Sequence, residues 1–242
     1  MKLEGKIAIV TGAAQGMGRG IAIKLAAEGA SVFVTSKEAP DEVVEYIRNH
    51  GGIAEGGIAD ISKLEDIPRM FDECEEKLGQ ADIFIANAGI APLVPIAQVT
   101  PEMFEQAFNT NARGTLFCLK EAGVRLKDNG HIVVISSSSV AQPVPGMCIY
   151  SSSKAALQLM SAVAAQEFAP RKINVNVVQP GLTVTPASTG VLPEAFINNM
   201  IEKTAMKRLA NPEDIANVVA FYASDESSWI TGQVILADGG VF

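Results

Sequence analysis

The chain has 242 residues, of which 48% are hydrophobic and 19% charged, a balance that excludes a disordered protein and indicates a buried core. Its net charge of −8 argues against nucleic-acid and anionic-membrane partners, because phosphate groups attract clustered Lys and Arg. The first residues lack the apolar stretch of a signal peptide, and the apolar runs are too short or too interrupted to span a bilayer. We therefore expect a cytoplasmic protein that binds a small molecule.

Short β-branched runs alternate with helical periodicity along the whole chain. The run from Lys6 to Val10 is followed by glycines and then by apolar residues at helical spacing. Further strands are expected at 31–35, 52–59, 81–86, 131–135, 173–178 and 233–236, and helices at 41–49, 63–78, 101–127, from about 150, and at 212–223. This alternation predicts an α/β fold of the Rossmann type, a doubly wound, mostly parallel sheet of seven strands with helices on both faces.

One irregular segment interrupts this alternation. No linker is visible, so residues 1–242 are expected to form a single catalytic domain. Between 183 and 209 the chain has two prolines, small polar residues and one helical stretch at 193–202. Such an insertion is typical of a lid, and we expect residues 186–209 to form a substrate loop that becomes ordered when ligand binds.

The first predicted strand runs directly into a glycine-rich turn. Gly12, Gly16 and Gly18 follow it at the spacing G-x3-G-x-G. Without Cβ atoms, such a turn lets backbone N–H groups and the next helix N-terminus approach a pyrophosphate. In this position the pattern predicts a dinucleotide site. Asn87-Ala88-Gly89 closes the fourth strand at the same edge of the sheet, although alone it is equally consistent with an ordinary turn.

Metal and thiol chemistry are not indicated. Cys74, Cys118 and Cys148 have neither the even count of a disulfide framework nor the spacing of metal ligands, and both histidines stand apart. We expect no metal site. Cys148 is expected to be a small buried residue.

Tyr150 and Lys154 have the spacing of residues that share one face of a helix. A phenol with a pKa near 10 is a poor base at neutral pH. An ammonium about 5 Å away, at an effective dielectric constant of about 20, stabilises the phenolate by about 3 kcal/mol, or roughly two pKa units. The pair therefore predicts a tyrosine that acts as acid and base.

These motifs, taken in chain order, resemble those of the short-chain dehydrogenase/reductase family. The matching segments are Thr11 to Gly18, Asn87-Ala88-Gly89, Asn111, a serine at the end of the fifth strand, Tyr150 to Lys154, Pro180-Gly181, Ile230 to Gln233 and Asp238-Gly239-Gly240. The resemblance covers essentially the whole chain and is nearest to bacterial 3-oxoacyl carrier-protein reductases and carbonyl reductases. It implies hydride transfer between a nicotinamide cofactor and a carbonyl or secondary alcohol.

The resemblance also implies four catalytic residues, Asn111, Ser137, Tyr150 and Lys154. Ser137 is chosen among the serines at 136–139 because the family serine lies about thirteen residues before the tyrosine, and Ser139 is the next candidate. The serine would stabilise the substrate oxygen as charge develops. Asn111 would hold a water that connects the lysine to solvent, and Lys154 would also bind the ribose.

Cofactor contacts follow from the same resemblance. The implied positions are Gly12, Gln15, Gly16, Met17, Gly18, Ser36, Lys37, Asp60, Ile61, Asn87, Ala88, Gly89, Tyr150, Lys154, Pro180, Gly181, Thr183 and Thr185. Asp60 would bind the adenine, Thr185 the carboxamide, and Thr183, where Ile or Val is usual, would contact the cofactor through its backbone.

The end of the second strand predicts which cofactor is preferred. Ser36 replaces the acidic residue that binds the ribose in NAD enzymes, and Lys37 follows where a basic residue meets the 2′-phosphate of NADP. We therefore expect a preference for NADP(H). NAD(H) is the alternative, because Gln15 replaces a second basic residue and Glu38 adjoins Lys37.

The loops around the site and the end of the chain indicate the class of substrate and the oligomeric state. Apolar residues in the loops at 91–97, 140–148 and 186–209, among them Leu93, Met147 and Val191, favour a hydrophobic ketone over a charged sugar. An NAD-dependent sugar or polyol dehydrogenase and a non-catalytic dinucleotide-binding sensor remain alternatives. An acyl carrier protein would need a basic patch, for which Arg125, Lys127, Arg171 and Lys172 are available. The resemblance and the apolar end at Val241-Phe242 favour a homotetramer.

Overall fold

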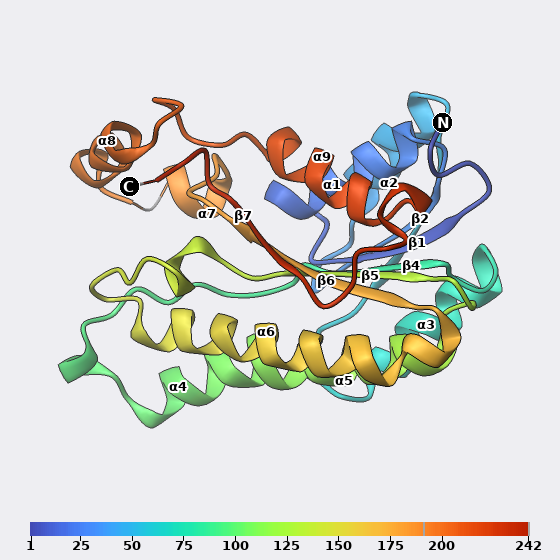
Figure 1. Ribbon diagram of the computed structural model, residues 1–242, viewed down its shortest axis with the longest axis horizontal. Helices are drawn as coiled ribbons and strands as arrows, with labels where there is room; N and C mark the ends of the chain where they lie inside the picture. The colour runs from blue at the N-terminus through green and yellow to red at the C-terminus, as the bar shows by residue number, and fades with distance from the viewer. Residues whose placement is uncertain (191, 242) are drawn as a thin grey trace.

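The computed structural model describes residues 1–190 and 192–241, so Val191 and Phe242, both named above, lie outside the described residues. Within these ranges seven strands form one sheet in the order β3-β2-β1-β4-β5-β6-β7, and every pairing is parallel (Figure 1). The strands are β1 (Ile7–Thr11), β2 (Ser31–Ser36), β3 (Ile53–Ile58), β4 (Ile83–Ala86), β5 (His131–Ile135), β6 (Asn174–Pro180) and β7 (Val234–Ala237). The predicted doubly wound α/β fold is confirmed.

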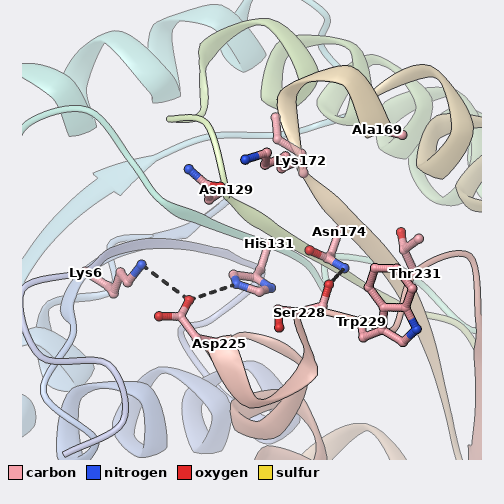
Figure 2. A pocket seen from close by; sticks show the side chains of 11 residues that line it. Lys6, Asn129, His131, Ala169, Lys172, Asn174, Asp225, Ser228, Trp229 and Thr231 are labelled. Atoms are coloured by element: carbon pink, nitrogen blue, oxygen red, sulfur yellow. Dashed lines mark hydrogen bonds and ion pairs between the residues drawn. The ribbon is translucent and has the colours of Figure 1, made fainter.

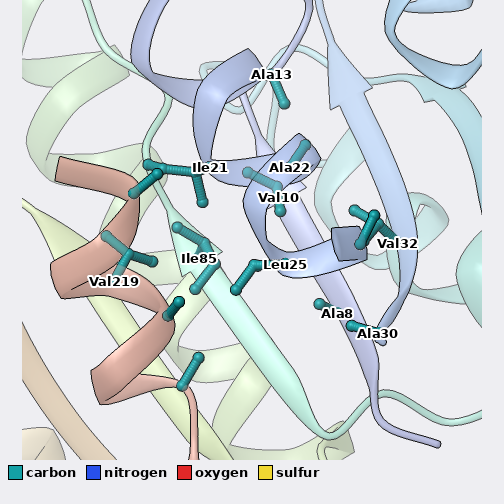
Figure 3. Packing of buried hydrophobic residues seen from close by; sticks show 14 of the residues in the cluster. Ala8, Val10, Ala13, Ile21, Ala22, Leu25, Ala30, Val32, Ile85 and Val219 are labelled. Atoms are coloured by element: carbon teal, nitrogen blue, oxygen red, sulfur yellow. The ribbon is translucent and has the colours of Figure 1, made fainter. Parts of the chain in front are cut away.

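Helices cover both faces of this sheet. On one face lie α1 (Gly16–Ala27), α2 (Asp41–Asn49) and α9 (Pro212–Tyr222), and on the other lie α3 (Asp66–Lys77), α4 (Pro101–Phe108), α5 (Thr115–Arg125) and α6 (Cys148–Glu167) (Figure 1). Successive strand residues point to opposite faces, so Val10 packs with Leu25 and Val219 in one core (Figure 3), whereas Ile9 joins the other. In the described residues no helix has the length and apolar character needed to cross a membrane.

The order of the strands creates a crevice at one edge of the sheet. From β1 the chain proceeds outward to β2 and β3, then returns to pair β4 against the other side of β1. The loops that follow β1 and β4 therefore leave the sheet side by side and in opposite directions. In open α/β sheets this switch point, at the carboxyl ends of the strands, is where ligands bind.

The helix predicted at 101–127 is divided into three parts. Between α4 and α5 lies η2 (Asn109–Gly114), a π-helical segment that contains Asn111. A π-helical turn holds an additional residue compared with an α-helical one, and it shifts the side chains that follow around the helix. The predicted helix is confirmed over 101–125, but its π-helical turn beside the site was not predicted.

The predicted insertion contains two helices instead of one. These are α7 (Pro186–Thr189), which begins with reciprocal hydrogen bonds between Thr185 and Ser188, and α8 (Glu194–Lys203), which buries none of its residues. After α8, the Ala205 N–H donates to the Gly240 carbonyl and Thr204 pairs with Val241. The C-terminal segment thus anchors the far end of the insertion.

Candidate active site

The glycine-rich turn after β1 leaves no room for a side chain at its glycine positions. Gly12 and Gly16 adopt positive φ angles of 63° and 57°, a conformation that favours glycine. A Cβ on Gly18 would clash with the Gly12 carbonyl oxygen and would lie 2.6 Å from Asn87 Nδ2. The N-terminus of α1 is therefore open to a ligand that approaches the backbone closely, as a pyrophosphate does.

Thr11 and Asn87 fasten this turn to the loop after β4. The Thr11 hydroxyl donates to the Ile85 carbonyl (3.1 Å) and accepts from the N–H groups of Asn87 (3.0 Å) and Ala88 (3.1 Å). Asn87 Nδ2 donates to the carbonyls of Thr11 (2.9 Å) and Gly12 (3.1 Å). Thr11 was not predicted as a site residue, although its position at the end of β1 was the available signal.

A cavity of about 700 Å³ opens at the switch point. Many of the predicted cofactor residues line it, namely Gly12, Gln15, Gly16, Met17, Gly18, Ser36, Lys37, Asp60, Ile61, Asn87, Ala88, Gly89 and Thr185. Its lining does not include the predicted Pro180, Gly181, Thr183, Tyr150 and Lys154. The missed lining residues include three carboxylates, Glu38, Asp41 and Glu42, which begin or precede α2. The size of the cavity and its glycine surface fit a dinucleotide.

Lys37 faces a carboxylate across the mouth of this cavity. Its Nζ lies 3.9 Å from Asp60 Oδ2, and its side chain is 64% exposed. Asp60 Oδ1 in turn accepts from the backbone N–H (3.0 Å) and the hydroxyl (2.7 Å) of Ser62. The Lys37 ammonium is therefore exposed enough to meet a phosphate group of a bound ligand, but the Asp60 carboxylate competes for it.

The segment after β6 packs against the glycine turn. Thr183 donates its hydroxyl to the Gly181 carbonyl (2.9 Å), and its own carbonyl accepts from the Ser188 hydroxyl (2.6 Å). A Cβ on Gly16 would lie 3.3 Å from Thr185 Cγ2. Thr185 therefore lies beside the turn.

Asn111 is fully buried, and both ends of its amide are hydrogen-bonded to protein groups. Its Oδ1 accepts from the Ile90 N–H (2.8 Å), and its Nδ2 donates to the Ile90 carbonyl (2.8 Å) and to Ser153 Oγ (2.9 Å). The Ser153 hydroxyl then donates to the Tyr150 carbonyl (2.7 Å). The π-helical segment is thus tied both to the loop after β4 and to α6.

Lys154 is buried in α6, and within the described residues its ammonium has one hydrogen-bond partner, a carbonyl. Its Nζ donates to the Ile135 carbonyl at the end of β5 (2.8 Å), and a Cβ on Gly89 would lie 3.2 Å from that nitrogen. Burial lowers the pKa of Lys154 to about 8. The lysine is therefore close to titrating near neutral pH, with its head beside the loop that lines the cavity.

Tyr150 lies one helical turn before Lys154 on α6. Burial raises the pKa of Tyr150, and the interaction with the Ser137 hydroxyl opposes this rise. The expectation that the pKa of the phenol would be lowered was wrong, because the effect of burial outweighs that of the groups that favour the phenolate. The Lys154 ammonium is instead directed to the Ile135 carbonyl.

The serines after β5 have distinct partners. Ser136 donates to the Lys154 carbonyl (3.0 Å), inside the protein. Ser137 Oγ accepts from the Ser139 N–H (3.2 Å) and lies 3.0 Å from Ser139 Oγ. The Ser151 hydroxyl donates to Ser139 Oγ (2.9 Å). Of the four serines, Ser137 is the one whose hydroxyl acts to lower the pKa of Tyr150.

Two of the predicted substrate loops meet above this site. The Val94 N–H donates to the Gly146 carbonyl (2.8 Å), and Leu93 is half exposed between them. Gln142 Nε2 donates to the Val241 carbonyl (2.9 Å), which joins the second loop to the C-terminal segment. Cys148 is exposed, so its prediction as a buried residue was wrong; its place at the first turn of α6 puts it at the surface.

A second cavity of about 700 Å³ lies at the amino ends of the strands, at the opposite edge of the sheet (Figure 2). His131 lies in its wall with Nε2 3.6 Å from Asp225 Oδ1, and the same oxygen lies 3.6 Å from Lys6 Nζ. Burial lowers the pKa of His131. None of the predicted site residues lines this cavity.

Comparison with known proteins identifies the family. Residues 12–242 match the family described as enoyl-(acyl carrier protein) reductase. The chain is 40% identical to an uncharacterized oxidoreductase of Methylorubrum extorquens, over 99% of both chains. It is 37% identical to tetrahydroxynaphthalene reductase of Pyricularia oryzae, over 98% of this chain and 90% of that protein. A short-chain dehydrogenase from Burkholderia cenocepacia, solved in complex with NADP, superposes with a TM-score of 0.94 at 32% identity over 99% of both chains. With its seven-stranded parallel sheet and this set of relatives, the chain belongs to the short-chain dehydrogenase/reductase family of oxidoreductases.

Proposed function

We propose that this protein is an NADP(H)-dependent reductase of hydrophobic ketones, with Tyr150 as the proton donor. The observation that carries the proposal is that Tyr150 shares α6 with the buried Lys154 one turn later and feels the Ser137 hydroxyl, next to a glycine-lined cavity that fits a dinucleotide. Burial holds the pKa of the phenol above its ordinary value, so Tyr150 keeps its proton at neutral pH. A protonated phenol is suited to the reduction of a carbonyl.

The cofactor positions divide along the crevice. Gly12, Gly16 and Gly18 would hold the pyrophosphate through the backbone at the N-terminus of α1. Asp60 and Ile61 would border the adenine, whereas Gly181 and its neighbours Pro180, Thr183 and Thr185 would border the nicotinamide. When bound, the nicotinamide supplies or accepts the hydride.

The four catalytic side chains divide the tasks of carbonyl reduction among them. Tyr150 gives its proton to the carbonyl oxygen, and Ser137 donates a hydrogen bond to the same oxygen while charge develops there. Lys154 binds the ribose hydroxyls and replaces the proton lost by the phenol. Asn111, through the main chain of η2, holds the water that connects Lys154 to solvent.

A panel of carbonyl compounds tests this proposal. The two meeting substrate loops are apolar, and one relative is named for a polyhydroxylated naphthalene substrate. With NADPH as cofactor, bicyclic aryl ketones are therefore expected to be reduced with a higher kcat/KM than 3-oxoesters or sugars. Tight NADPH binding without turnover of any compound would instead favour a dinucleotide sensor, and preferred oxidation of polyols with NAD would favour a sugar dehydrogenase.

Lys37 is expected to set the preference for NADPH. Lys37→Ala loses the charge-assisted contact to the 2′-phosphate. This should raise the free-energy barrier reported by kcat/KM for NADPH by about 1.5 to 3 kcal/mol and leave kcat/KM for NADH nearly unchanged. The nearby Asp60, Glu38, Asp41 and Glu42 place the effect toward the lower end of that range. Steady-state kinetics with both cofactors measures it.

Lys63→Ala is the matched control for this experiment. Lys63 is exposed, lies three residues after Asp60 and does not line the cavity. Its loss should therefore leave kcat/KM unchanged for both NADPH and NADH. Equal losses for NADPH and NADH in Lys37→Ala, or a wild type that prefers NADH, would contradict the cofactor assignment.

Two separate apolar surfaces support a homotetramer. The edge strand β7 exposes Val234, Ile235 and Leu236 to about 40% each, and α6 exposes Leu159 and Val163, four residues apart. Two different self-complementary patches generate a tetramer with closed symmetry. Light scattering should therefore give about four times the chain mass of 25.5 kDa. A monomer at micromolar concentration would contradict the proposed assembly.

A further inference from the structure

Three serine hydroxyls form a chain that ends at the site of the reaction. The Ser151 hydroxyl, on the first turn of α6, donates to Ser139 Oγ (2.9 Å), and Ser139 Oγ lies 3.0 Å from Ser137 Oγ. Ser137 in turn interacts with the phenol of Tyr150. The chain therefore approaches the catalytic tyrosine from α6 through the short helix η3 (Ser138–Val140).

The direction of these hydrogen bonds follows from what each hydroxyl can offer. A serine hydroxyl has one proton to donate and two lone pairs to accept. Because Ser151 donates to Ser139, the proton of Ser139 is free to be donated to Ser137. Ser137 Oγ also accepts from the Ser139 N–H (3.2 Å), so both of its lone pairs are occupied by Ser139. Ser137 can then act only as a donor, with its single proton directed to the phenol in this structure and available to a substrate oxygen that takes its place.

We propose that Ser139, supported by Ser151, is a positioning residue that holds Ser137 as a hydrogen-bond donor toward the substrate oxygen. The inference rests on the role given to Ser137 under the proposed function. A Ser137 that donates stabilises the developing negative charge on the carbonyl oxygen, whereas one that accepts would not. Hydrogen bonds in a row also polarise one another, so Ser151 strengthens the donor at the far end.

The turn itself does not require the Ser139 hydroxyl. The backbone N–H of Ser139 already donates to Ser137 Oγ, which caps η3. The Ser139 side chain is nevertheless buried, and among the described residues its hydroxyl has hydrogen bonds only with the hydroxyls of Ser137 and Ser151. A buried hydroxyl bonded between two others is explained by the orientation that it imposes on them.

A double-mutant cycle tests the coupling. Ser139→Ala is expected to lower kcat/KM for the ketone by about three- to tenfold, as the loss of one hydrogen bond predicts, and to act mainly on kcat. Ser151→Ala should lower it by about two- to fivefold. In a Ser137→Ala background each change should cost less than about twofold, because the group that they position is gone. Ser152→Ala, an exposed neighbour on the same helix, is the control and should match the wild type.

Titration of the Tyr150 phenol gives a second readout that needs neither cofactor nor turnover. The Ser137 interaction lowers the pKa of Tyr150, so a weakened Ser137 donor should move the phenol titration to higher pH. Ultraviolet difference absorbance against Tyr150→Phe should show this shift in Ser139→Ala and Ser151→Ala but not in Ser152→Ala. Ser139→Thr, which keeps the hydroxyl, should restore the titration and the activity.

The outcomes separate this inference from the proposed function. Retained turnover in Tyr150→Phe and Ser137→Ala would remove the proposed function, and the phenol titration would still decide on the hydroxyl chain. An unshifted titration, or losses in the Ser137→Ala background as large as in the wild type, would overturn the inference. It would also be overturned if Ser139→Ala abolished turnover while Ser137→Ala retained it, because Ser139 would then bind the substrate itself. If Ser139→Ala fails to fold, Ser151→Ala, a change at a half-buried position, tests the inference instead. The same measurements apply, namely kcat/KM in the wild-type and Ser137→Ala backgrounds and the titration of the phenol.

Discussion

Tyr150→Phe is expected to lower kcat for ketone reduction by at least about 10²-fold while NADPH still binds. The change removes one hydroxyl and keeps the ring, so the packing of α6 against the sheet is preserved. General acid catalysis by a positioned side chain contributes roughly 10² to 10⁴ in rate, and the Tyr150 phenol is the group proposed to supply the proton. Turnover measurements together with a fluorescence titration of NADPH separate the chemical step from binding.

Tyr46→Phe is the control for this experiment. Tyr46 is a partly exposed residue of α2 that stacks on His50 and lies below the Arg19 guanidinium, outside the catalytic group. Its variant should retain the activity of the wild type. If Tyr150→Phe kept more than about a tenth of the wild-type kcat, Tyr150 could not be the acid, since the lower limit for such catalysis is about 10².

Lys154→Met should have the second large effect, a loss of kcat of about 10²-fold or more. The variant keeps the buried volume of the stem but removes the ammonium that donates to the Ile135 carbonyl and that we assign to the ribose and to the proton supply. Because Lys154 also helps to bind the cofactor, KM for NADPH is expected to rise. In Tyr150→Phe, by contrast, KM for NADPH should remain close to that of the wild type.

The same lysine predicts how stability depends on pH. Burial lowers its pKa from 10.5 to about 8, so between these values the unfolded chain binds more protons than the folded protein. Stability therefore rises with pH from about 8 to 10.5, and below about pH 8 the buried charge imposes a constant penalty. Between pH 7.5 and 9.5 the wild type should gain about 2 kcal/mol of unfolding free energy relative to Lys154→Met.

Urea unfolding of both proteins at the two pH values measures this difference. The other titratable groups are common to both chains, so their contributions cancel in the comparison. Parallel pH profiles for the wild type and Lys154→Met would contradict a lowered pKa for Lys154. A wild type that loses stability relative to the variant as the pH rises would mean that burial is outweighed by a carboxylate or another acceptor close to the ammonium.

The fold was readable from the sequence because it depends on local periodicity. Strands such as β1 and β5 are continuous apolar runs, as strands covered on both faces must be, and the helices between them carry their own period. The glycine turn was equally local, since a closely approached backbone tolerates no side chain at Gly12 or Gly18. The spacing of Tyr150 and Lys154 placed both residues on one face of α6 before any contact was known.

The chemistry of the site was decided by tertiary contacts instead. The π-helical turn at Asn111 arises where its amide bonds to Ile90 and Ser153, and no periodicity within 101–127 announces it. Burial raises the pKa of Tyr150, and Lys154 donates to the carbonyl of Ile135, nineteen residues away. A helical spacing determines which side chains are neighbours, but burial and the choice of hydrogen-bond partner depend on everything that packs around them, and only the folded chain brings those groups together.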